Sequence, residues 1–165
     1  MPNASASGVV KNFRDGTLVL KDGTSGTPKS YTITLEDGNF TYTPGKHAMI
    51  VVMDRGEIAG SRKGAKAPGS FSFEVKMTQF TASDEDTLID VIDQTGNWSD
   101  AVSVAGGEYE QFLHSLVYTV EGEDHGDDAD HVLTLAKVYL EWGFKEGDQN
   151  TIVISGQVLG TETRA

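Results

Sequence analysis

VLTLAKVYLEWGF, from Val132 to Phe144, is followed by the turn EGDQN and then by TIVISGQVLG, which ends at Gly160. These two apolar runs around a glycine-containing turn predict a long β-hairpin. Successive side chains of a strand point to opposite faces. The even-numbered face of the first run is the expected core face, while the odd-numbered face mixes apolar and charged residues. The even-numbered set is Val132, Ala136, Val138, Leu140, Trp142 and Phe144.

The second run of the hairpin is apolar on both sides. Ile152, Ile154 and Val158 lie on one side, and Val153 and Leu159 lie on the other. A strand of this kind is either buried on both faces or meets a partner with the second face. We therefore expect the chain to assemble with other molecules.

The length and composition predict one turn-rich domain over residues 1–165. The chain has 19 glycines and 38% hydrophobic residues, a composition that suits a β protein with many turns. We expect residues 1–7 to form a flexible N-terminal arm and residues 161–165 a C-terminal tail. The absence of cysteine excludes disulfides and thiolate chemistry and fits a reducing cytosol. No signal sequence or membrane-spanning run is evident, so no membrane association is expected.

The formal net charge of -12 argues against tight binding to nucleic acid or to an anionic membrane. It is compatible with a surface past which DNA moves without being held.

Short apolar runs separated by Asp-Gly and Pro-Gly turns predict the remaining strands. The expected strands cover residues 8–14, 17–21, 30–36, 39–43, 47–53, 70–78 and 114–120. The run from Ser70 to Thr78 alternates strictly and predicts a core face that carries Phe71 and Phe73. Its opposite face, with Glu74 and Lys76, is expected to meet water or a wet channel.

One helix is expected, from about residue 84 to 94. Ser83 suits the N-cap with Asp86 three residues later, and Gly96 is a natural stop. The apolar stripe at helical spacing predicts that the helix covers an opening or flank of the sheet. The stripe consists of Leu88, Ile89, Val91 and Ile92.

A long glycine-rich loop is expected from about residue 54 to 69. It is the most basic stretch of an acidic chain, and structureless loops of this length are usually functional or disordered. We predict that it is mobile in the free subunit and ordered between stacked subunits; the alternative is a floppy connector. The residues assigned to this stacking role are Arg55, Gly56, Glu57, Arg62, Lys63 and Lys66.

A second loop is acidic. Clustered carboxylates suit hard cations, but the spacing matches no EF-hand, and a solvated loop explains the charges better. Neither a Gly-x-Ser-x-Gly elbow nor a phosphate-binding glycine loop occurs. We expect no metal, no cofactor and no enzymatic activity. The acidic residues are Glu121, Glu123, Asp124, Asp127, Asp128 and Asp130.

In its order of features, the chain from about Gly8 to Gly160 resembles phage tail tube (major tail) proteins. The matching features are the N-terminal short hairpins, the YTPG turn at 42–45, the Arg55-Gly56 loop that leads into APGSFSF at 67–73, the single helix, and the C-terminal GDQN hairpin at 147–150. The resemblance implies a mostly β fold, a β-sandwich or half-open barrel of antiparallel strands with one flanking helix.

The resemblance also implies a biological role. It implies hexameric rings stacked into a hollow tube, with DNA passing through a channel lined by joined inner sheets. The expected partners are other copies of the chain, together with tape-measure, tail-terminator and baseplate or tail-tip proteins. The expected location is the virion tail, assembled in the host bacterial cytoplasm. We expect this channel to be acidic and lined mainly by carboxylates and small polar groups, with Glu74 and Lys76 as candidates for its wall.

A β-sandwich binding module, for instance a carbohydrate-binding domain, is the alternative. Such a module should display a row of exposed aromatic side chains. Trp98 and Trp142 are the only tryptophans, and Trp142 falls on the expected core face.

Overall fold

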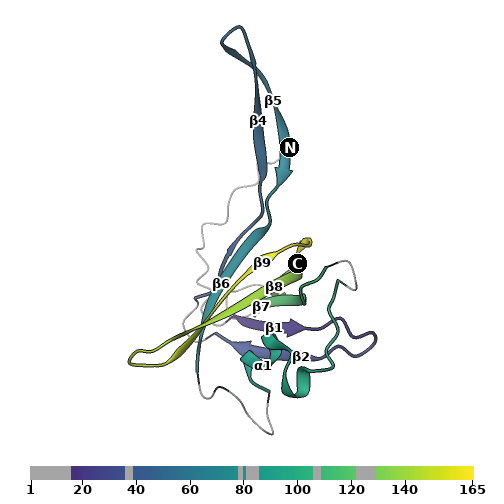
Figure 1. Ribbon diagram of the computed structural model, residues 1–165, viewed down its shortest axis with the longest axis vertical. Coiled ribbons are helices and arrows are strands. Elements are labelled where there is room, and N and C mark those ends of the chain that lie inside the picture. Colours follow the sequence, from purple (N-terminus) through teal and green to yellow (C-terminus); the bar gives the residue numbers. More distant parts are fainter. Residues whose placement is uncertain (1–15, 36–38, 78–79, 81–85, 106–108, 122–128) are drawn as a thin grey trace.

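The computed structural model describes residues 16–35, 39–77, 80, 86–105, 109–121 and 129–165 (Figure 1). These residues form ten strands and one α-helix, α1 (Leu88–Asp93), which is followed by a short 3-10 helix, η1 (Gly96–Trp98). The strands are β1 (Thr17–Lys21), β2 (Ser30–Thr34), β3 (Thr41–Thr43), β4 (His47–Asp54), β5 (Glu57–Lys66), β6 (Gly69–Lys76), β7 (His114–Val120), β8 (His131–Lys145), β9 (Thr151–Val158) and β10 (Glu162–Arg164).

Eight strands form one antiparallel sheet in the order β2-β1-β7-β8-β9-β6-β3, with β10 also paired to β8. The sheet is open and does not close into a barrel, and α1 packs against it. β4 and β5 form a separate two-stranded sheet that projects from the body (Figure 1). The expected class, a mostly β half-open barrel with one flanking helix, is confirmed.

β8 is the strand that joins the two halves of the sheet. Its first part pairs with β7, from His131 to Val138, and its second part pairs with β9, from Val138 to Lys145. β10 continues along the β9 side of β8 and pairs with Leu133–Leu135. The sequence at 161–165, expected as a C-terminal tail, therefore contains a paired strand.

A β-bulge at Lys137 changes which side of β8 faces the core. His114 of β7 pairs with Val138 of β8, and Leu116 pairs with Leu135. Two residue steps along β7 therefore correspond to three along β8, and Lys137, in this interval, has φ 54°. An extra residue in a strand reverses the side-chain parity beyond it. Leu135 is consequently buried on one side of the bulge, and Val138 and Leu140 on the other.

The predicted even-numbered core face of β8 is therefore only partly correct. Val132 and Ala136 are half-buried rather than core residues, because they precede the bulge. Trp142 and Phe144 follow the bulge on the core side but remain 37% and 44% exposed, because β8 extends beyond the packed core.

The core lies between the two halves of the sheet and is completed by α1. The predicted core sides of β6 and β9 are confirmed: Phe71 and Phe73 are buried, as are Ile152, Ile154 and Val158. From the other half, Leu18, Leu20, Leu116 and Leu135 pack into the same cluster. The four residues of the predicted helical stripe are buried in it as well.

The helix is shorter than predicted. Thr87 is the N-cap: its hydroxyl accepts a hydrogen bond from the Asp90 backbone N–H and donates one to the Asp90 carboxylate. The predicted cap Ser83 lies outside the described residues, and Asp86 precedes the helix. Gln94, in the left-handed region at φ 53°, ends α1, so Gly96 begins η1 instead of stopping the helix.

The predicted loop at 54–69 is wrong for most of its length. Residues 57–66 form β5, which pairs with β4 in a hairpin. Arg55 and Gly56 form its two-residue turn, both with positive φ (51° and 87°), as a type I′ turn requires. We call β4, β5 and this turn the arm, residues 47–66.

Several other predictions concern short segments. β1 and β7 match the strands predicted at 17–21 and 114–120. The N-terminal arm at 1–7, the strand at 8–14 and the Asp37-Gly38 turn lie outside the described residues. No helix in the described part of the chain is long and apolar enough to cross a membrane.

Candidate functional site

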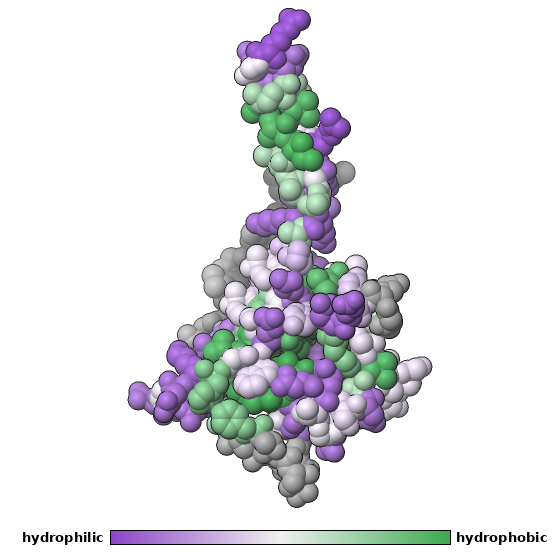
Figure 2. Space-filling model, in the orientation of Figure 1, coloured by the Kyte–Doolittle hydropathy of each residue, from purple (hydrophilic) through white to green (hydrophobic). Residues whose placement is uncertain are grey.

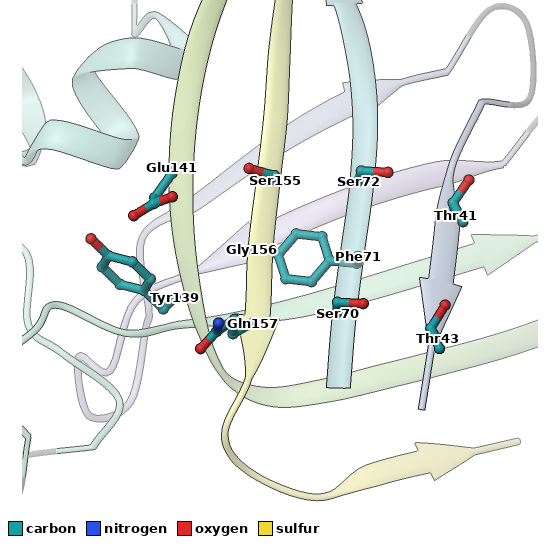
Figure 3. A pocket seen from close by; sticks show the side chains of 10 residues that line it. All are labelled: Thr41, Thr43, Ser70, Phe71, Ser72, Tyr139, Glu141, Ser155, Gly156 and Gln157. Atoms are coloured by element: carbon teal, nitrogen blue, oxygen red, sulfur yellow. The ribbon is translucent and has the colours of Figure 1, made fainter. Parts of the chain in front are cut away.

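The outward face of β3, β6, β9 and the second part of β8 is a polar surface (Figure 3). The opposite sides of these strands supply the core, so strand alternation places small hydroxyl and amide side chains outside. They are Thr41, Thr43, Ser70, Ser72, Ser155 and Gln157. A shallow hollow of about 410 Å³ lies among them, bordered by Tyr139 and Glu141. We call this surface the wet face.

Charges on the wet face are few and balanced. Glu74 and Lys76 of β6 lie on it, exposed, as strand alternation predicted. Glu141 and Lys145 follow the same alternation on β8. Within the described residues, the face therefore carries two acids and two bases among many hydroxyl groups. The wet face is therefore polar and close to neutral, and it is less acidic than expected for a surface that lines an acidic channel.

Gly156 of β9 lies between the outward-facing Ser155 and Gln157. A Cβ atom added there would lie 2.2 Å from the Tyr139 carbonyl oxygen and 2.5 Å from the Phe71 ring. Gly156 therefore leaves room for the buried Phe71 ring to pack against the backbone on the core side of β9.

Both sides of this four-stranded unit end in unpaired backbone. β3 pairs with β6 on one edge, and no described strand pairs with its other edge. β8 pairs with β7 only as far as Val138, so Tyr139–Lys145 have no described strand partner on that edge. Exposed edges can each receive a further strand.

The arm is apolar, basic and exposed. Residues that pair across two antiparallel strands lie on the same face. One face of the arm therefore carries an apolar stripe of Met49, Val51, Met53 and Ile58. Met49 is 73% exposed and Ile58 72%. Figure 2 shows these apolar side chains gathered along the arm. The residues predicted for stacking all lie here: Arg55 and Gly56 form the turn, and Glu57, Arg62, Lys63 and Lys66 lie on β5.

The base of the arm is fastened to the C-terminal strand. The Tyr42 hydroxyl of β3 hydrogen-bonds to the Glu162 carboxylate of β10, which also forms an ion pair with Arg164. Desolvation and the hydrogen bond to Glu162 raise the pKa of Tyr42 to about 12, so the phenol remains a donor. This contact joins β3 to β10 beneath the arm.

Two buried polar side chains lie away from these surfaces. Asp22 accepts hydrogen bonds from the backbone N–H of Lys29 (2.7 Å) and Val102 (3.3 Å) and from the Thr24 hydroxyl (2.5 Å). Burial opposes ionisation of Asp22, but these hydrogen bonds prevail and lower its pKa. His114 Nε2 lies 3.2 Å from the Val91 carbonyl oxygen, and burial lowers the pKa of His114 to about 4. Both are positioned as structural groups.

The acidic loop is described only at its ends. Glu121 and Asp130 are exposed, while Glu123, Asp124, Asp127 and Asp128 lie outside the described residues. Within the described part of the chain, no three His, Asp or Glu side chains are close enough to hold a metal ion.

Comparison with known proteins places the fold. No family model and no curated protein matches the sequence. The chain is similar in structure to one in an extracellular contractile injection system, the PVC sheath/tube terminator in its extended state, with TM-score 0.61 and 8% identity. That match covers 97% of this chain and 99% of the other.

Two further structures have the same fold. A chain of the PVC sheath-tube complex in its extended state gives TM-score 0.57 at 9% identity, over 96% of this chain and 93% of that one. A chain of the sixfold-symmetrised anti-feeding prophage baseplate gives TM-score 0.57 at 12% identity, over 97% of both chains. At such identities the likeness shows a shared fold over nearly the whole chain, as the resemblance in the sequence implies.

Proposed function

We propose that this chain is a structural subunit of a tail-type tube and not an enzyme. Copies join side by side into hexameric rings, and the rings stack into a hollow tube with the wet face inside. The observation that carries the proposal is the combination of two unpaired edges on one polar sheet with an exposed apolar arm. The full-length fold likeness to tube, terminator and baseplate assemblies supports it.

Ring formation follows from the edges. In the proposed ring, the free edge of β3 adds to the free edge of β8 at Tyr139–Lys145 in the next copy, so the polar faces of all copies join into one wall. Backbone hydrogen bonds between edges depend little on sequence, which fits a fold that persists at 8–12% identity. A heterologous contact of this kind closes into a ring when its rotation divides a full turn.

Stacking is assigned to the arm. A two-stranded hairpin is marginally stable alone in water, and contiguous exposed apolar patches on soluble proteins mark interaction sites. In the proposed tube, the arm reaches along the tube axis to the next ring and buries its apolar stripe there. This retains the stacking role predicted for Arg55–Lys66 and gives it to a hairpin.

The proposed cargo is DNA, as the resemblance to phage tail tube proteins implies. On this hydroxyl-rich wall two bases are balanced by two acids, Glu74 and Lys76 among them, so phosphate meets no cluster of basic residues among those described and DNA could slide past. Tape-measure, terminator and baseplate or tail-tip proteins are the proposed partners, and the virion tail, assembled in the host cytoplasm, the proposed location.

Electron microscopy of the purified chain tests the proposal. We expect sixfold rings and tubes for the full chain. We expect rings or monomers, with unchanged circular dichroism of the body, when residues 48–65 are replaced by a short Gly-Ser turn. A chain that stays monomeric at all concentrations, or tubes that persist without the arm, would overturn it.

The carbohydrate-binding alternative has less support. The described wet face lacks the expected row of exposed aromatics, since Tyr139 is its single aromatic side chain directed outward, but Phe80, Trp142 and Phe144 are exposed elsewhere on the body. Trp98 is buried in the core. Glycan binding by a stable monomer in the same experiment would favour this alternative.

A further inference from the structure

A cluster of exposed aromatic side chains lies beside the β8–β9 turn. Phe80 and Phe144 pack with ring centroids 5.4 Å apart, and both are about half exposed. Trp142, on the same side of β8, donates its indole N–H to both carboxylate oxygens of Asp93, at 3.0 and 3.1 Å. We call Phe80, Trp142 and Phe144 the aromatic shelf.

The sheet register places the shelf and the arm at opposite ends of the same strands. The Gly69 end of β6 continues from the arm and pairs with Val158, whereas its Lys76 end pairs with Thr151 beside the β8–β9 turn. Phe144 pairs with Ile152 at this second end. Seven steps of about 3.3 Å place the two ends roughly 23 Å apart. In this structure the arm projects away from the β8–β9 turn, so it does not cover the shelf of its own molecule (Figure 1).

The two surfaces are complementary in chemistry. The arm offers Met49, Met53 and Ile58, flexible apolar side chains that pack well against aromatic rings. Arm residues 47–66 include four basic and two acidic residues, a net of +2, which leaves -14 for the rest of a chain whose total is -12. Asp93 places a carboxylate at the shelf, where it accepts the Trp142 hydrogen bonds. A basic apolar arm fits an aromatic surface with a carboxylate beside it on a body that is acidic as a whole.

We propose that the aromatic shelf is the receptor for the arm of a second copy of this chain. The inference rests on the proposed tube and names the partner surface of its stacking contact. Donor and receptor lie at opposite ends, so the contact is head-to-tail and leaves a free arm at one end of the stack and a free shelf at the other. Such a polymer grows without limit until another protein covers one of these ends.

Cysteine cross-linking tests the contact directly, because the chain has no cysteine of its own. A chain that carries Met53→Cys is mixed with a chain that carries Phe144→Cys and oxidised under assembly conditions. We expect a disulfide-linked heterodimer on a non-reducing gel, since a disulfide forms only when Cβ atoms come within about 4.5 Å. Val102→Cys replaces Phe144→Cys in the control, because Val102 is equally exposed but lies outside the shelf.

Assembly assays supply the second test. Phe80→Ser and Phe144→Ser change exposed side chains, so the body should fold normally. The critical concentration for tube growth should rise on the order of ten- to a hundredfold for each apolar side chain lost from the contact. The shelf variant, which combines Phe80→Ser with Phe144→Ser, keeps its arm, and the arm-shortened variant keeps its shelf. Each should fail to polymerise alone. When the two are mixed, the arm of the first should bind the shelf of the second, and growth should stop at this one contact.

The outcomes separate the two proposals. If arm shortening abolishes tubes while the shelf variant polymerises normally, the tube function stands and the shelf is not the receptor. A cross-link to Val102→Cys as strong as that to Phe144→Cys also contradicts the shelf. If arm shortening leaves tubes intact, the proposed stacking function itself fails.

Discussion

His114 is a neutral histidine enclosed by aromatic rings. It is 1% exposed, lies against Trp98 and Phe112, and its Nδ1 has no hydrogen-bond partner. Burial lowers its pKa from 6.5 to about 4, against smaller opposing effects from the Val91 carbonyl and Asp22. Between these two pH values, His114 binds a proton in the unfolded chain but stays neutral in the folded chain.

The first prediction concerns pH. Stability from neutral His114 is fully present above about pH 6.5 and is lost as the pH falls towards 4, because the unfolded state binds more protons in this window. The loss should reach roughly 3 kcal/mol at pH 4. Urea unfolding of the arm-shortened monomer at pH 7.5 and 4.5 measures it. His114→Leu should remove most of the difference.

The unfolding free energies should be compared only down to about pH 4.5, because carboxylates contribute to the pH dependence below that. Asp22 and Asp90 have lowered pKa values, so their stabilisation is lost only as the pH falls below 3.8. The matched control for the full chain is His47→Gln, on the exposed arm, which should keep the wild-type pH dependence. Equal slopes for His114→Leu and the wild type would contradict the assignment.

Lys137 gives the second prediction. Its φ of 54° is a left-handed conformation that a β-branched residue adopts only with strain, at about 1–2 kcal/mol. We expect Lys137→Val to lower the free energy of unfolding by at least that amount. Lys137→Gly should cost less, because glycine adopts this conformation without strain, although it removes side-chain contacts that include the Lys137–Tyr109 cation–π contact. Urea midpoints of the two variants decide it; equal losses would mean that backbone strain is not the cause.

At the scale of residues, the sequence shows which side chains are apolar but not whether each one lies in the core or on an exposed surface. Trp142 and Phe144 have the alternation of core residues, yet they form an exposed shelf, because residues for a core and for an interface are equally apolar. The bulge was hidden for a different reason. Lysine carries no preference that marks a left-handed position, and one inserted residue reverses the parity.

At the scale of elements, the helix shows why a boundary can be ambiguous. Ser83 with Asp86 and Thr87 with Asp90 are two consecutive N-cap patterns of the same form. The structure uses Thr87 and Asp90, and tertiary contacts decide which of two equally capped starts occurs. The apolar stripe, by contrast, was predicted correctly, since helical spacing leaves one buried face.

Only half of the arm was predicted: the strand expected at 47–53 matches β4, but β5 was read as a loop because its signals conflict. β4 is apolar at nearly every position, while β5 contains Gly60 and Gly64, which weaken a strand. The turn at Arg55-Gly56 carries a glycine at one of two positive-φ positions and an arginine at the other. Hairpin turns of this type favour Asn-Gly or Asp-Gly, so the pattern favoured a loop.

The third prediction is that the arm becomes ordered on assembly. Two strands without a third strand or a core are marginal in water, and ordering costs about 1–2 kcal/mol per residue. Amide hydrogens of β4 and β5 should therefore exchange rapidly in free subunits and slowly in tubes. Amides of β9, paired on both sides, should be protected in both states and act as the internal control. Strong protection of the arm in free subunits would contradict this prediction.

At the scale of the whole molecule, the sheet order could be predicted only in part. The β8–β9 hairpin is local and carries a clear turn, so the sequence reveals it. The pairing of β1 with β7 joins residues about a hundred positions apart, and no local pattern encodes it. Opposite placement of the arm and the shelf depends on another distant pairing, that of β6 with β9, so the stacking surfaces could be named only once the strands were placed.

The last prediction concerns salt. Two electrostatic effects oppose each other during growth: the arm, at +2, is attracted to an acidic neighbour, while acidic bodies repel. Raising the ionic strength from about 0.05 to about 0.5 M shortens the screening length from roughly 14 to roughly 4 Å and weakens both. The charges of the arm and of the neighbouring shelf come closer together than the charges of two bodies do. Attraction of the arm should therefore dominate the elongation rate at low salt.

Removing the charge of the arm separates these effects. In the wild type, elongation measured by light scattering should slow severalfold as salt rises. In Arg62→Ser with Lys63→Ser, only repulsion between bodies remains to be screened, so elongation should instead speed up with salt. Lys21→Ser with Lys29→Ser removes the same charge from the body and should retain the wild-type direction, since an exposed ion pair such as Lys29–Asp100 adds little stability. The same salt response in both double variants would show that the basic residues of the arm do not guide assembly.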